Sequence, residues 1–327
     1  MRDVENKKIA PVYLLHGDEP YYIDILSKYL SENILSEEER AFNQMTVYGK
    51  DVDHLSLLTE LKSFPVMAER RMIIIREAQY FKEIDKLENY LENPLNTSVL
   101  IICHKYSKID ARKKVFKSIG KNGIVFTSDK VKEYQLADWV QKIVRQKGFT
   151  ISSKACMLLV EFLGNDLSKI ANEIDKLSLL IEKGTTISDV HVEENIGISK
   201  DYNVFELNNA ISKKDLDKAF RIIQYFHYNP KAVSFAHVTS TLFRFFSQLM
   251  RIHFLANKSK EGVAKSIGVH PFVAGQLLQA SALFNPTMVA RSIEIIHEYD
   301  LKSKGVNSSN VPPAELMKEL VFKIIHP

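Results

Sequence analysis

The chain has 327 residues, of which 45% are hydrophobic and 26% are charged, a composition typical of a soluble globular protein with two or three domains. Its net charge of +4 argues against a strongly basic nucleic-acid binder. The N-terminus has no apolar run typical of a signal peptide, and no stretch approaches the roughly 18 apolar residues of a membrane span. We therefore expect a cytoplasmic protein without a membrane partner. Cys103 and Cys156 lie in apolar surroundings, which favours buried, reduced thiols.

Strands and helices alternate in the first part of the chain. The predicted strands are short apolar runs, at Val12–Leu15, Met72–Ile75, Val99–Cys103 and Ile124–Phe126, with a weaker one at Met45–Tyr48. Near-continuous apolar strands separated by amphipathic segments are typical of a parallel sheet that helices cover on both faces. We therefore predict an α/β domain that ends near residue 134.

The first turn of this domain, in "PVYLLHGDEPYYIDIL" (11–26), has the strand–glycine–helix order of a nucleotide-binding P-loop. A P-loop needs a second glycine, a lysine for the phosphates and a hydroxyl for magnesium. Counted from Gly17, those three positions hold Tyr22, Ile23 and Asp24. The side chains that bind phosphate and magnesium in a P-loop are therefore missing.

Two carboxylates also stand at the start of the helix that follows. Asp18 and Glu19 would use the positive field of the helix N-terminus and repel a triphosphate. Asp18 as the N-cap, with Pro20 in the first turn, explains these residues without any ligand. We therefore expect no ATP at this turn.

Two other positions that an ATPase of this architecture requires are also altered. The strand in "RRMIIIREAQYF" (70–81) ends in Arg76 and Glu77, so a guanidinium stands where a carboxylate would bind magnesium. Glu77 is more simply explained as a strand-end or salt-bridging residue. In "LGNDLSKI" (163–170), Ser168 takes the place of a basic residue that would reach the phosphates, with Lys169 beside it. The scaffold of a nucleotide-binding domain is thus predicted without its hydrolysis chemistry.

From Gln135 onward the strand signal fades, and helices are predicted to the end of the chain. One helix lies in "YQLADWVQKIVRQKGF" (134–149), and two more follow, broken around residues 164–166. This segment is predicted to form a small helical domain that ends near residue 200. The remainder, from Val204, is helical again, with turns at 228–230, 285–286 and 304–313, and 303–313 is predicted to be a mobile loop.

The stretch "EGVAKSIGVHPFVAGQLLQ" (261–279) fits a helix-turn-helix, with Gly268 in the turn. A DNA-reading second helix offers Arg, Asn, Gln or Ser near its N-terminus. The second helix here begins instead with an apolar packing surface, His270-Pro271-Phe272-Val273-Ala274. Helix packing is therefore favoured over base recognition.

A basic stripe is predicted in "ARKKVFKSIGKNG" (111–123), where Lys113, Lys117 and Lys121 are spaced four apart. They lie opposite Val115, Phe116 and Ile119 on the predicted helix. Such a stripe is most often a solvated helix face, although it could touch a DNA backbone. No HExxH motif, paired CxxC motif or histidine spacing predicts a metal site, and no nucleophile–base pair or carboxylate dyad is evident.

Six stretches, taken together in order and spacing, resemble the delta-subunit family of the bacterial DNA polymerase III clamp loader. They are "VYLLHGDEPYYI" (12–23), "SFPVMAERRMIII" (63–75), "SKIDARKKVFKSI" (107–119), "GNDLSKIANEIDKLSLL" (164–180), "VAKSIGVHPFVAGQLLQASALF" (263–284) and "IHEYDLKSKG" (296–305). The resemblance covers essentially the full chain and implies an α/β plus all-α fold. Its three domains would be a RecA-like parallel-sheet AAA+ domain without a working P-loop (1–134), a small helical lid domain (135–200) and a C-terminal helical collar domain (201–327).

The resemblance also implies a function that depends on binding rather than on catalysis. A delta subunit binds the ring-shaped sliding clamp (the beta subunit) and opens it for loading onto primed DNA. It works in a hetero-pentamer with the motor and delta-prime subunits, which usually carry a four-cysteine zinc module that two distant cysteines cannot build. The chain is expected to hold no cofactor and to have no intrinsic catalysis, since nucleotidyl transfer belongs to the DNA-directed DNA polymerase that the loader serves.

The clamp-contacting segment of the family falls on "SFPVMAERR" (63–71), which assigns clamp binding to Phe64, Val66 and Met67, with Pro65 shaping the backbone. An apolar plug with a charged rim suits a groove on a partner protein. From spacing alone, these residues could instead cap the sheet's own core, just before the strand at 72–75. Two other functions remain open at this stage: an AAA+ ATPase with a divergent nucleotide site, and a helix-turn-helix DNA-binding regulator.

Overall fold

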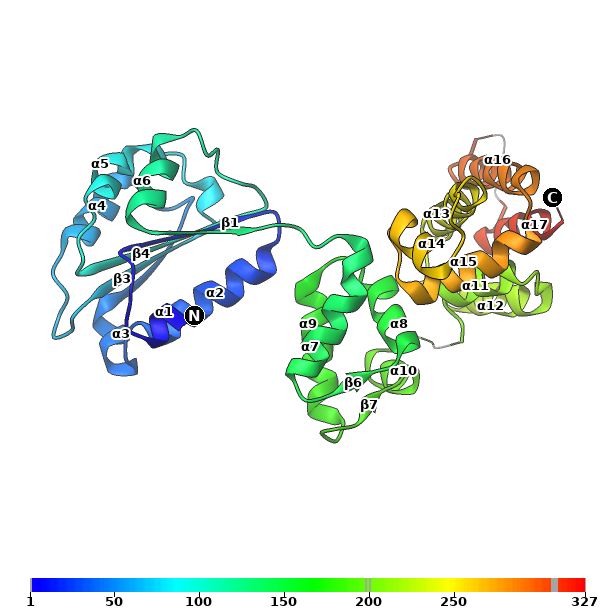
Figure 1. Ribbon diagram of the computed structural model, residues 1–327, viewed down its shortest axis with the longest axis horizontal. Coiled ribbons are helices and arrows are strands. Elements are labelled where there is room, and N and C mark those ends of the chain that lie inside the picture. The colour runs from blue at the N-terminus through cyan, green and yellow to red at the C-terminus, as the bar shows by residue number, and fades with distance from the viewer. Residues whose placement is uncertain (1, 198, 200, 307–310, 327) are drawn as a thin grey trace. The chain divides into compact units, whose positions relative to one another are not determined.

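The computed structural model describes residues 2–197, 199, 201–306 and 311–326 (Figure 1). The chain divides into two compact units, Met1–Val131 and Lys132–Pro327, which we call the N-terminal and C-terminal units. None of the helices in the described ranges combines the length and the apolar character that crossing a bilayer requires. The division of the C-terminal unit into lid and collar domains stays a prediction.

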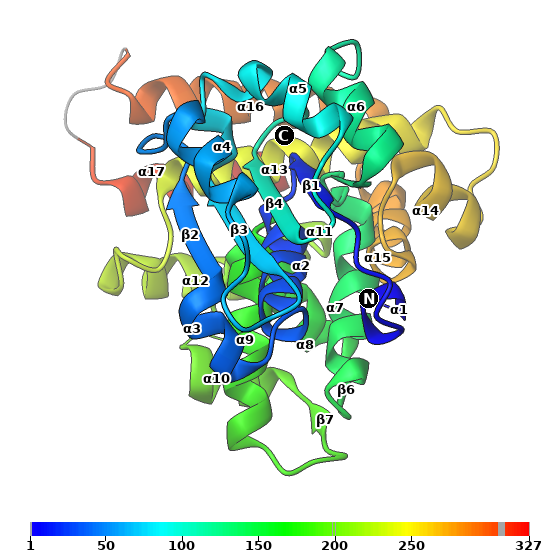
Figure 2. The ribbon, with the colours of Figure 1, turned by 90° about the vertical axis from the view of Figure 1, so that its left-hand side faces the viewer.

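The N-terminal unit is built on a five-stranded parallel sheet with strand order β2-β3-β4-β1-β5. Figure 2 shows β2, β3, β4 and β1 side by side in that order. The strands are β1 (Val12–Gly17), β2 (Gln44–Tyr48), β3 (Arg71–Arg76), β4 (Ser98–Lys105) and β5 (Ile124–Ser128). All five predicted strands are confirmed. Each is slightly longer than its apolar run, because the backbone pairing of the sheet continues past one or both ends of that run.

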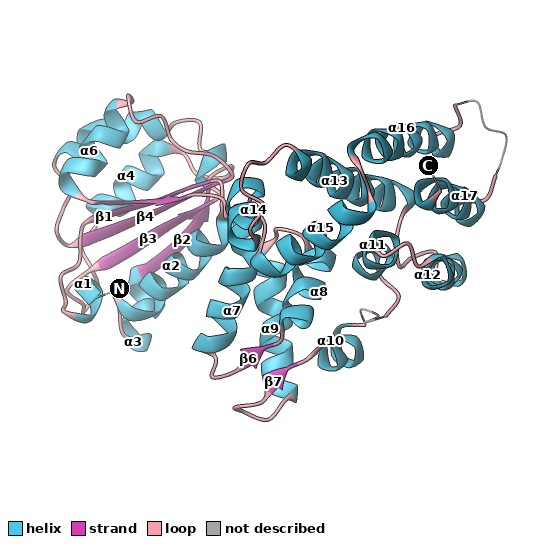
Figure 3. Ribbon diagram, turned by 45° about the vertical axis from the view of Figure 1, so that its right-hand side comes forward, coloured by secondary structure: helices cyan, strands magenta, loops and turns pink. Residues whose placement is uncertain are grey.

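Helices cover both faces of this sheet (Figure 3). Leu14, Ile73 and Leu100 belong to the core on one face, whereas their neighbours along the strands point into the core on the other face. The first core packs against α4 (His54–Lys62), α5 (Glu88–Glu92) and α6 (Lys114–Asn122), and the second against α1 (Arg2–Glu5) and α2 (Pro20–Asn33), with α3 (Glu37–Asn43) on the same side. Burial on both faces explains why the three inner strands, β1, β3 and β4, are apolar at nearly every position, whereas the outer strands β2 and β5 are partly exposed.

Short 3₁₀ helices complete the N-terminal unit. They are η1 (Ala78–Tyr80) and η2 (Ile84–Leu87), which lead from β3 toward α5. The parallel order places the first residues of all strands at one edge of the sheet and the last residues at the opposite edge. These two edges carry the two sites described below.

The C-terminal unit begins with η3 (Glu133–Gln135) and four helices. These are α7 (Leu136–Gln146), α8 (Ser153–Leu163), α9 (Leu167–Leu180) and α10 (Asp189–Ile196), and the predicted break between the second and third helices is confirmed. The structure also contains a parallel pair of two-residue strands, β6 (Thr150–Ile151) and β7 (Thr186–Ile187), where no strand was predicted. Two residues are too few to show a period in the sequence, and the pair forms only because the helices bring its ends together.

The rest of the unit packs around a single apolar core in which Phe246, Phe284 and Tyr299 are fully buried. Its helices are α11 (Val204–Ser212), α12 (Leu216–Tyr228), α13 (Phe235–His253), α14 (Lys260–Ile267), α15 (Pro271–Leu283), α16 (Pro286–Ser303) and α17 (Pro313–Ile325). The predicted helix-turn-helix is α14 and α15, with Gly268 in the left-handed region at φ 77°. Residues 307–310 of the predicted mobile loop lie outside the described residues.

Both cysteines are free and buried, as predicted. Burial raises the pKa of the Cys103 thiol, and it raises the pKa of the Cys156 thiol to about 12. Since the thiolate is the reactive form, neither residue has the character of a nucleophile.

Candidate functional site

The loop between α4 and β3 presents apolar side chains to solvent at the edge where the sheet's strands begin. We call residues Ser63–Arg70 the tip segment. Within it, Phe64 is 85% exposed, Val66 is 50% exposed and Met67 is 100% exposed, while Pro65 is only partly exposed. The alternative in which these residues cap the core of the sheet therefore does not describe the structure.

The tip segment is anchored to the N-terminal unit at its centre and at its C-terminal end. The side-chain oxygen of Asn43 accepts the Val66 N–H at 2.7 Å, and the Asn43 amide nitrogen donates to the Val66 carbonyl at 2.9 Å. Arg70 donates to the Asn96 carbonyl at 2.7 Å. Arg71 forms an ion pair with Glu60 of α4. The predicted polar rim consists of Glu69, Arg70 and Arg71. Of these, only Glu69 faces solvent, because the two arginines bond to their own unit.

An exposed apolar cluster on an anchored loop is suited to bind another protein. Burying a fully exposed Phe or Met side chain contributes about 1.5–3 kcal/mol, so solvent exposure of two such residues disfavours a purely structural role. A few aromatic or aliphatic anchors in a matched groove can supply most of the free energy of an interface. The tip segment is therefore the candidate binding site of this unit.

At the opposite edge of the sheet, the chain's own acceptors occupy the amides that a P-loop would offer to phosphate. The Gly17 N–H donates to the Ser107 carbonyl at 3.1 Å, and the Glu19 N–H donates to the Ser128 carbonyl at 3.2 Å. The Tyr21 N–H donates to the Glu19 carboxylate at 3.1 Å. The helix N-cap is thus Glu19 and not Asp18, so that prediction is wrong by one residue. The helix begins at Pro20, directly after Glu19. The Glu19 side chain folds back to accept a hydrogen bond in the first turn.

The turn after β1 is also tightly closed. Gly17 has φ 140°, and a Cβ atom placed on it would lie 2.1 Å from the Ser128 carbonyl oxygen. The Ser128 hydroxyl in turn donates to the Glu19 carbonyl at 2.7 Å. Asp24, at the position of a P-loop hydroxyl, forms an ion pair with Lys105 at 2.6 Å. The amides of the turn and the carboxylate at the hydroxyl position thus have their partners within the chain.

Two histidines lie on neighbouring strands at this edge. His16 is almost fully buried, and its Nδ1 accepts the Ile109 N–H at 3.0 Å while its Nε2 lies 3.0 Å from the Thr127 hydroxyl. Burial, followed by the nearby His104 and Lys108, lowers the pKa of His16. Burial also lowers the pKa of His104. Burial therefore disfavours the charged form of both rings.

The other altered ATPase positions have ordinary structural roles. Arg76 is exposed at the end of β3, and Glu77 adopts a left-handed conformation at φ 51° as the chain turns into η1. Ser168 lies in the first turn of α9, and Lys169 faces the N-cap Asp166, with which it forms an ion pair at 3.5 Å. Among the described residues, no group of three His, Cys, Asp or Glu side chains could hold a metal ion.

The predicted basic stripe lies at α6 and is exposed along its length. Lys113 precedes the helix and forms an ion pair with Asp85 at 2.8 Å. Lys117 and Lys121 have no carboxylate within 4.0 Å in the part of the chain that the structure describes, while Val115 and Ile119 face the core. Two of the three lysines are thus available to an anionic partner.

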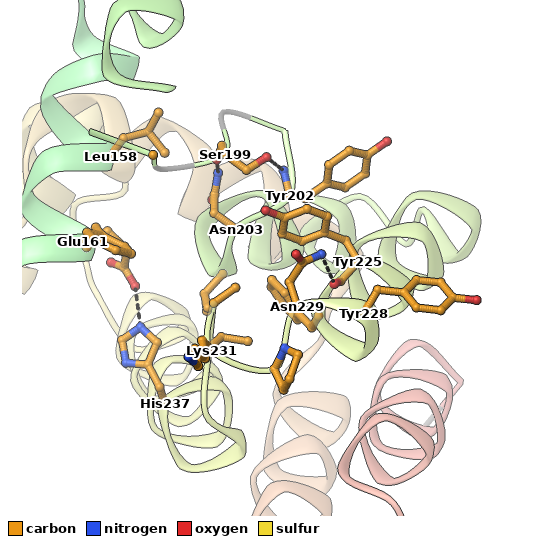
Figure 4. A pocket seen from close by; sticks show the side chains of 17 residues that line it. Leu158, Glu161, Ser199, Tyr202, Asn203, Tyr225, Tyr228, Asn229, Lys231 and His237 are labelled. Atoms are coloured by element: carbon orange, nitrogen blue, oxygen red, sulfur yellow. Dashed lines mark hydrogen bonds and ion pairs between the residues drawn. The ribbon is translucent and has the colours of Figure 1, made fainter. Parts of the chain in front are cut away.

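A cavity of about 490 Å³ lies within the C-terminal unit, next to α8, α12 and α13 (Figure 4). Glu161 faces His237 across it at 3.9 Å, and the Tyr202 ring is stacked on Tyr225 with 5.2 Å between the ring centres. Asn229 donates to the Tyr225 carbonyl at 2.9 Å, which only satisfies the end of α12. Among its described lining residues, the Glu161–His237 pair has no nucleophile bonded to it, and we base no function on this cavity.

The matching family models and the curated relatives with similar sequence agree on one family. The family model "DNA polymerase III, delta subunit" matches residues 13–129, and "DNA polymerase III delta subunit, C-terminal domain" matches residues 201–318. The chain is 24% identical to the Bacillus subtilis DNA polymerase III subunit delta over 318 residues, covering 92% of this chain and 90% of that protein. It is 23% identical over 225 residues to a probable DNA polymerase III subunit delta of Aquifex aeolicus, covering 65% of this chain and 62% of that protein.

A solved structure has the same fold. The Bacillus subtilis DNA clamp loader delta protein superposes with a TM-score of 0.58 at 21% sequence identity, over 100% of this chain and 98% of that chain. At this level of identity the match establishes the fold: a parallel five-stranded α/β unit followed by helices, as in the clamp loader delta protein.

The fold defines a parallel-sheet α/β protein in which the turn after the first strand is closed and an apolar tip is exposed at the opposite edge of the sheet. The two family models together match more than two thirds of the chain. The chain belongs to the DNA polymerase III delta subunit family.

Two residues in these sites were not identified from the sequence. Asn43 lies 23 positions before Val66, and His16 lies 93 positions before Ile109, so neither contact has a local sequence signal. His16 could have been noticed as a polar residue within an apolar strand, which requires hydrogen-bond partners when it is buried.

Proposed function

We propose that this chain is the clamp-opening delta subunit of a bacterial clamp loader. It binds the sliding clamp (the beta subunit) through the tip segment, with Phe64, Val66 and Met67 as apolar anchors and Pro65 shaping the loop. Family membership supports the clamp loader role, and the exposure of these side chains supports their assignment. The motor and delta-prime subunits would join it in a hetero-pentamer that acts on primed DNA in the cytoplasm.

Opening of the ring would follow from binding energy alone. A ligand shifts a conformational equilibrium only by its difference in affinity for the two states. The tip would therefore bind more tightly to the interface geometry of the open clamp than to that of the closed clamp. No bond is made or broken by this chain, and polymerisation belongs to the enzyme that uses the loaded clamp.

The observation that carries this proposal is the solvent exposure of large apolar side chains on an anchored loop. The alternative of an active ATPase has little support, because the amides of Gly17, Glu19 and Tyr21 are already bonded within the chain. The alternative of a DNA-reading helix-turn-helix also has little support. Its second helix, α15, turns Ala274, Leu277 and Ala280 into the core, and the exposed side chains at its start are the apolar Pro271 and Phe272.

The proposal predicts that Phe64→Ala and Met67→Ala each weaken binding of the purified chain to the sliding clamp without nucleotide. Truncating a central anchor typically costs about 2 kcal/mol, which corresponds to roughly a 30-fold weaker Kd. Since both side chains are exposed, the free energy of unfolding should change by no more than about 0.5 kcal/mol. Titration calorimetry and urea unfolding measure the two quantities.

Tyr80→Ala is the matched control, because Tyr80 is an exposed aromatic residue just after β3, at the opposite edge of the sheet. It should leave clamp affinity unchanged. Clamp binding that survives both tip substitutions would show that the tip segment is not the contact. A loss of clamp affinity in Tyr80→Ala equal to that of the tip variants would also show that the effect is not specific to the tip segment.

A further inference from the structure

Asn43 is a buried polar residue in an unusual place. It is the last residue of α3, it is 1% exposed, and its side chain points toward the tip segment rather than toward a sheet neighbour. A buried amide is retained only when its hydrogen bonds are satisfied, because an unpaired buried amide is costly.

The Asn43 side chain makes three hydrogen bonds, and two of them go to the backbone N–H and carbonyl of Val66 in the tip segment. Its oxygen accepts the Val66 N–H at 2.7 Å, and its nitrogen donates to the Val66 carbonyl at 2.9 Å and to the Glu39 carbonyl at 3.1 Å. The reversed amide orientation would place donor against donor and acceptor against acceptor, so the two Val66 bonds fix the orientation of the side chain.

These bonds hold the middle residue of the exposed apolar cluster. Val66 lies between Phe64 and Met67, and Met67 adopts the left-handed conformation at φ 50°, which residues other than glycine seldom adopt. Such a conformation persists only when the surroundings fix it. The hydrogen bonds hold Val66 on both sides of its Cα atom, so they fix the direction in which the backbone enters Met67. The Met67 side chain then points into solvent.

We propose that Asn43 is a positioning residue for clamp binding, which preorganises the tip segment so that Phe64 and Met67 are presented in their bound arrangement. This inference rests on the proposed function of the tip. A loop that is already ordered loses less conformational entropy on binding, so it binds more tightly with the same contacts. Asn43 itself need not touch the clamp.

The test is clamp affinity of the full chain, without nucleotide, for three substitutions. Asn43→Ala removes every bond to Val66 and should weaken the Kd about tenfold or more, as expected when one or two residues must be ordered on binding. Asn43→Asp keeps an acceptor for the Val66 N–H and loses the donor, so it should restore part of the affinity. Asn122→Ala is the matched control.

Asn122 is suited to this purpose because its amide nitrogen also bonds two backbone carbonyls in the N-terminal unit, those of Leu91 at 2.9 Å and Glu92 at 2.8 Å. Its loss should lower the melting temperature and leave clamp affinity unchanged. Hydrogen exchange gives a second readout that a purely structural role would not produce. In Asn43→Ala, the Val66 amide should exchange faster, while the β3 amides of Ile73 and Ile74 keep their protection.

Unchanged clamp affinity in Asn43→Ala, or unchanged exchange at Val66, would overturn the inference while the tip assignment stands on the Phe64 and Met67 substitutions. If Asn43→Ala is unfolded at the assay temperature, the Asn43→Asp result decides: affinity equal to that of the native chain overturns the inference, and intermediate affinity supports it. Absence of binding by the native chain would overturn both the inference and the proposed function.

Discussion

At the closed edge of the sheet, buried polar side chains find their hydrogen-bond partners within the chain. His16 is the best example, since its two ring nitrogens face the Ile109 N–H and the Thr127 hydroxyl, each at 3.0 Å. This arrangement needs a neutral ring with its proton on Nε2, because Nδ1 must accept. A protonated His16 would face the Ile109 N–H with a second donor.

This geometry predicts a pH dependence of stability. Burial lowers the pKa of His16 in the folded chain, so the unfolded chain binds a proton at a pH at which the folded chain does not. The contribution of His16 is therefore fully present above its unfolded pKa of about 6.5 and is lost as the pH falls through the lower folded value. Urea unfolding between pH 7.5 and pH 5.5 should show this loss.

His16→Gln is the diagnostic variant, because it removes the titrating group while a polar side chain remains. Its free energy of unfolding should vary less with pH over this range than that of the native chain. Some slope should remain, since burial also lowers the pKa of His104. Parallel pH profiles for the two proteins would contradict the account of His16.

For single residues, the clamp-binding assignment of the tip segment came from the family resemblance and not from the sequence pattern. Spacing alone left open whether Phe64, Val66 and Met67 cap the sheet, because an apolar run before a strand is compatible with either arrangement. The N-cap was misplaced by one residue, since Asp18 and Glu19 are both acidic and only the backbone geometry decides between them. Asn43 could not be predicted, because its partner is distant in sequence.

Among the elements, the turn between β1 and α2 is the clearest case of a shape that depends on one residue type. Gly17→Ala should destabilise the chain by about 3 kcal/mol or more, because the added Cβ would overlap the Ser128 carbonyl and φ 140° disfavours any side chain. Urea unfolding measures the change.

Gly120→Ala provides the matched control for that substitution. Gly120 lies within α6 with no atom within 4 Å of an added Cβ, so alanine there should stabilise the chain by about 0.5–1 kcal/mol through higher helix propensity. Equal effects of the two substitutions would contradict the tight closure of the turn.

Helix α6 carries the prediction about DNA. Lys113 is already paired with Asp85, so only Lys117 and Lys121 remain as candidates for backbone contacts. If they touch DNA in the assembled loader, the double substitution to Glu should reduce the dependence of log K on log salt for primed DNA by about two. Lys50→Glu, another exposed lysine of the same unit, should leave the slope unchanged. Identical slopes for all three proteins would exclude this contact.

For the whole molecule, the sequence predicted the parallel sheet and the long helices because their signals are spread over many residues. Three of the five apolar runs, such as Met72–Ile75, are buried on both faces, and an apolar run of this kind indicates a strand without knowledge of its tertiary contacts. The β6–β7 pair was missed because Thr150 and Ile151 pair with Thr186 and Ile187 only after the helices between them have packed. Elements that depend on distant contacts leave little trace in local sequence.

The two edges of the sheet give the molecule its proposed mode of action. The edge that would hold a nucleotide is closed by Gly17, Ser128 and the Asp24–Lys105 pair, whereas the opposite edge exposes Phe64 and Met67. Under the proposed function, nucleotide control of clamp opening would come from the motor subunits.

The most direct test is release of sliding clamps from closed circular DNA by the isolated chain without nucleotide. A clamp can leave a closed circle only if its ring opens. We predict release by the native chain and none by the Phe64/Val66/Met67 triple alanine variant, with both proteins folded by circular dichroism. Clamps that stay on the DNA while the native chain binds them would contradict the claim that binding by this tip opens the ring.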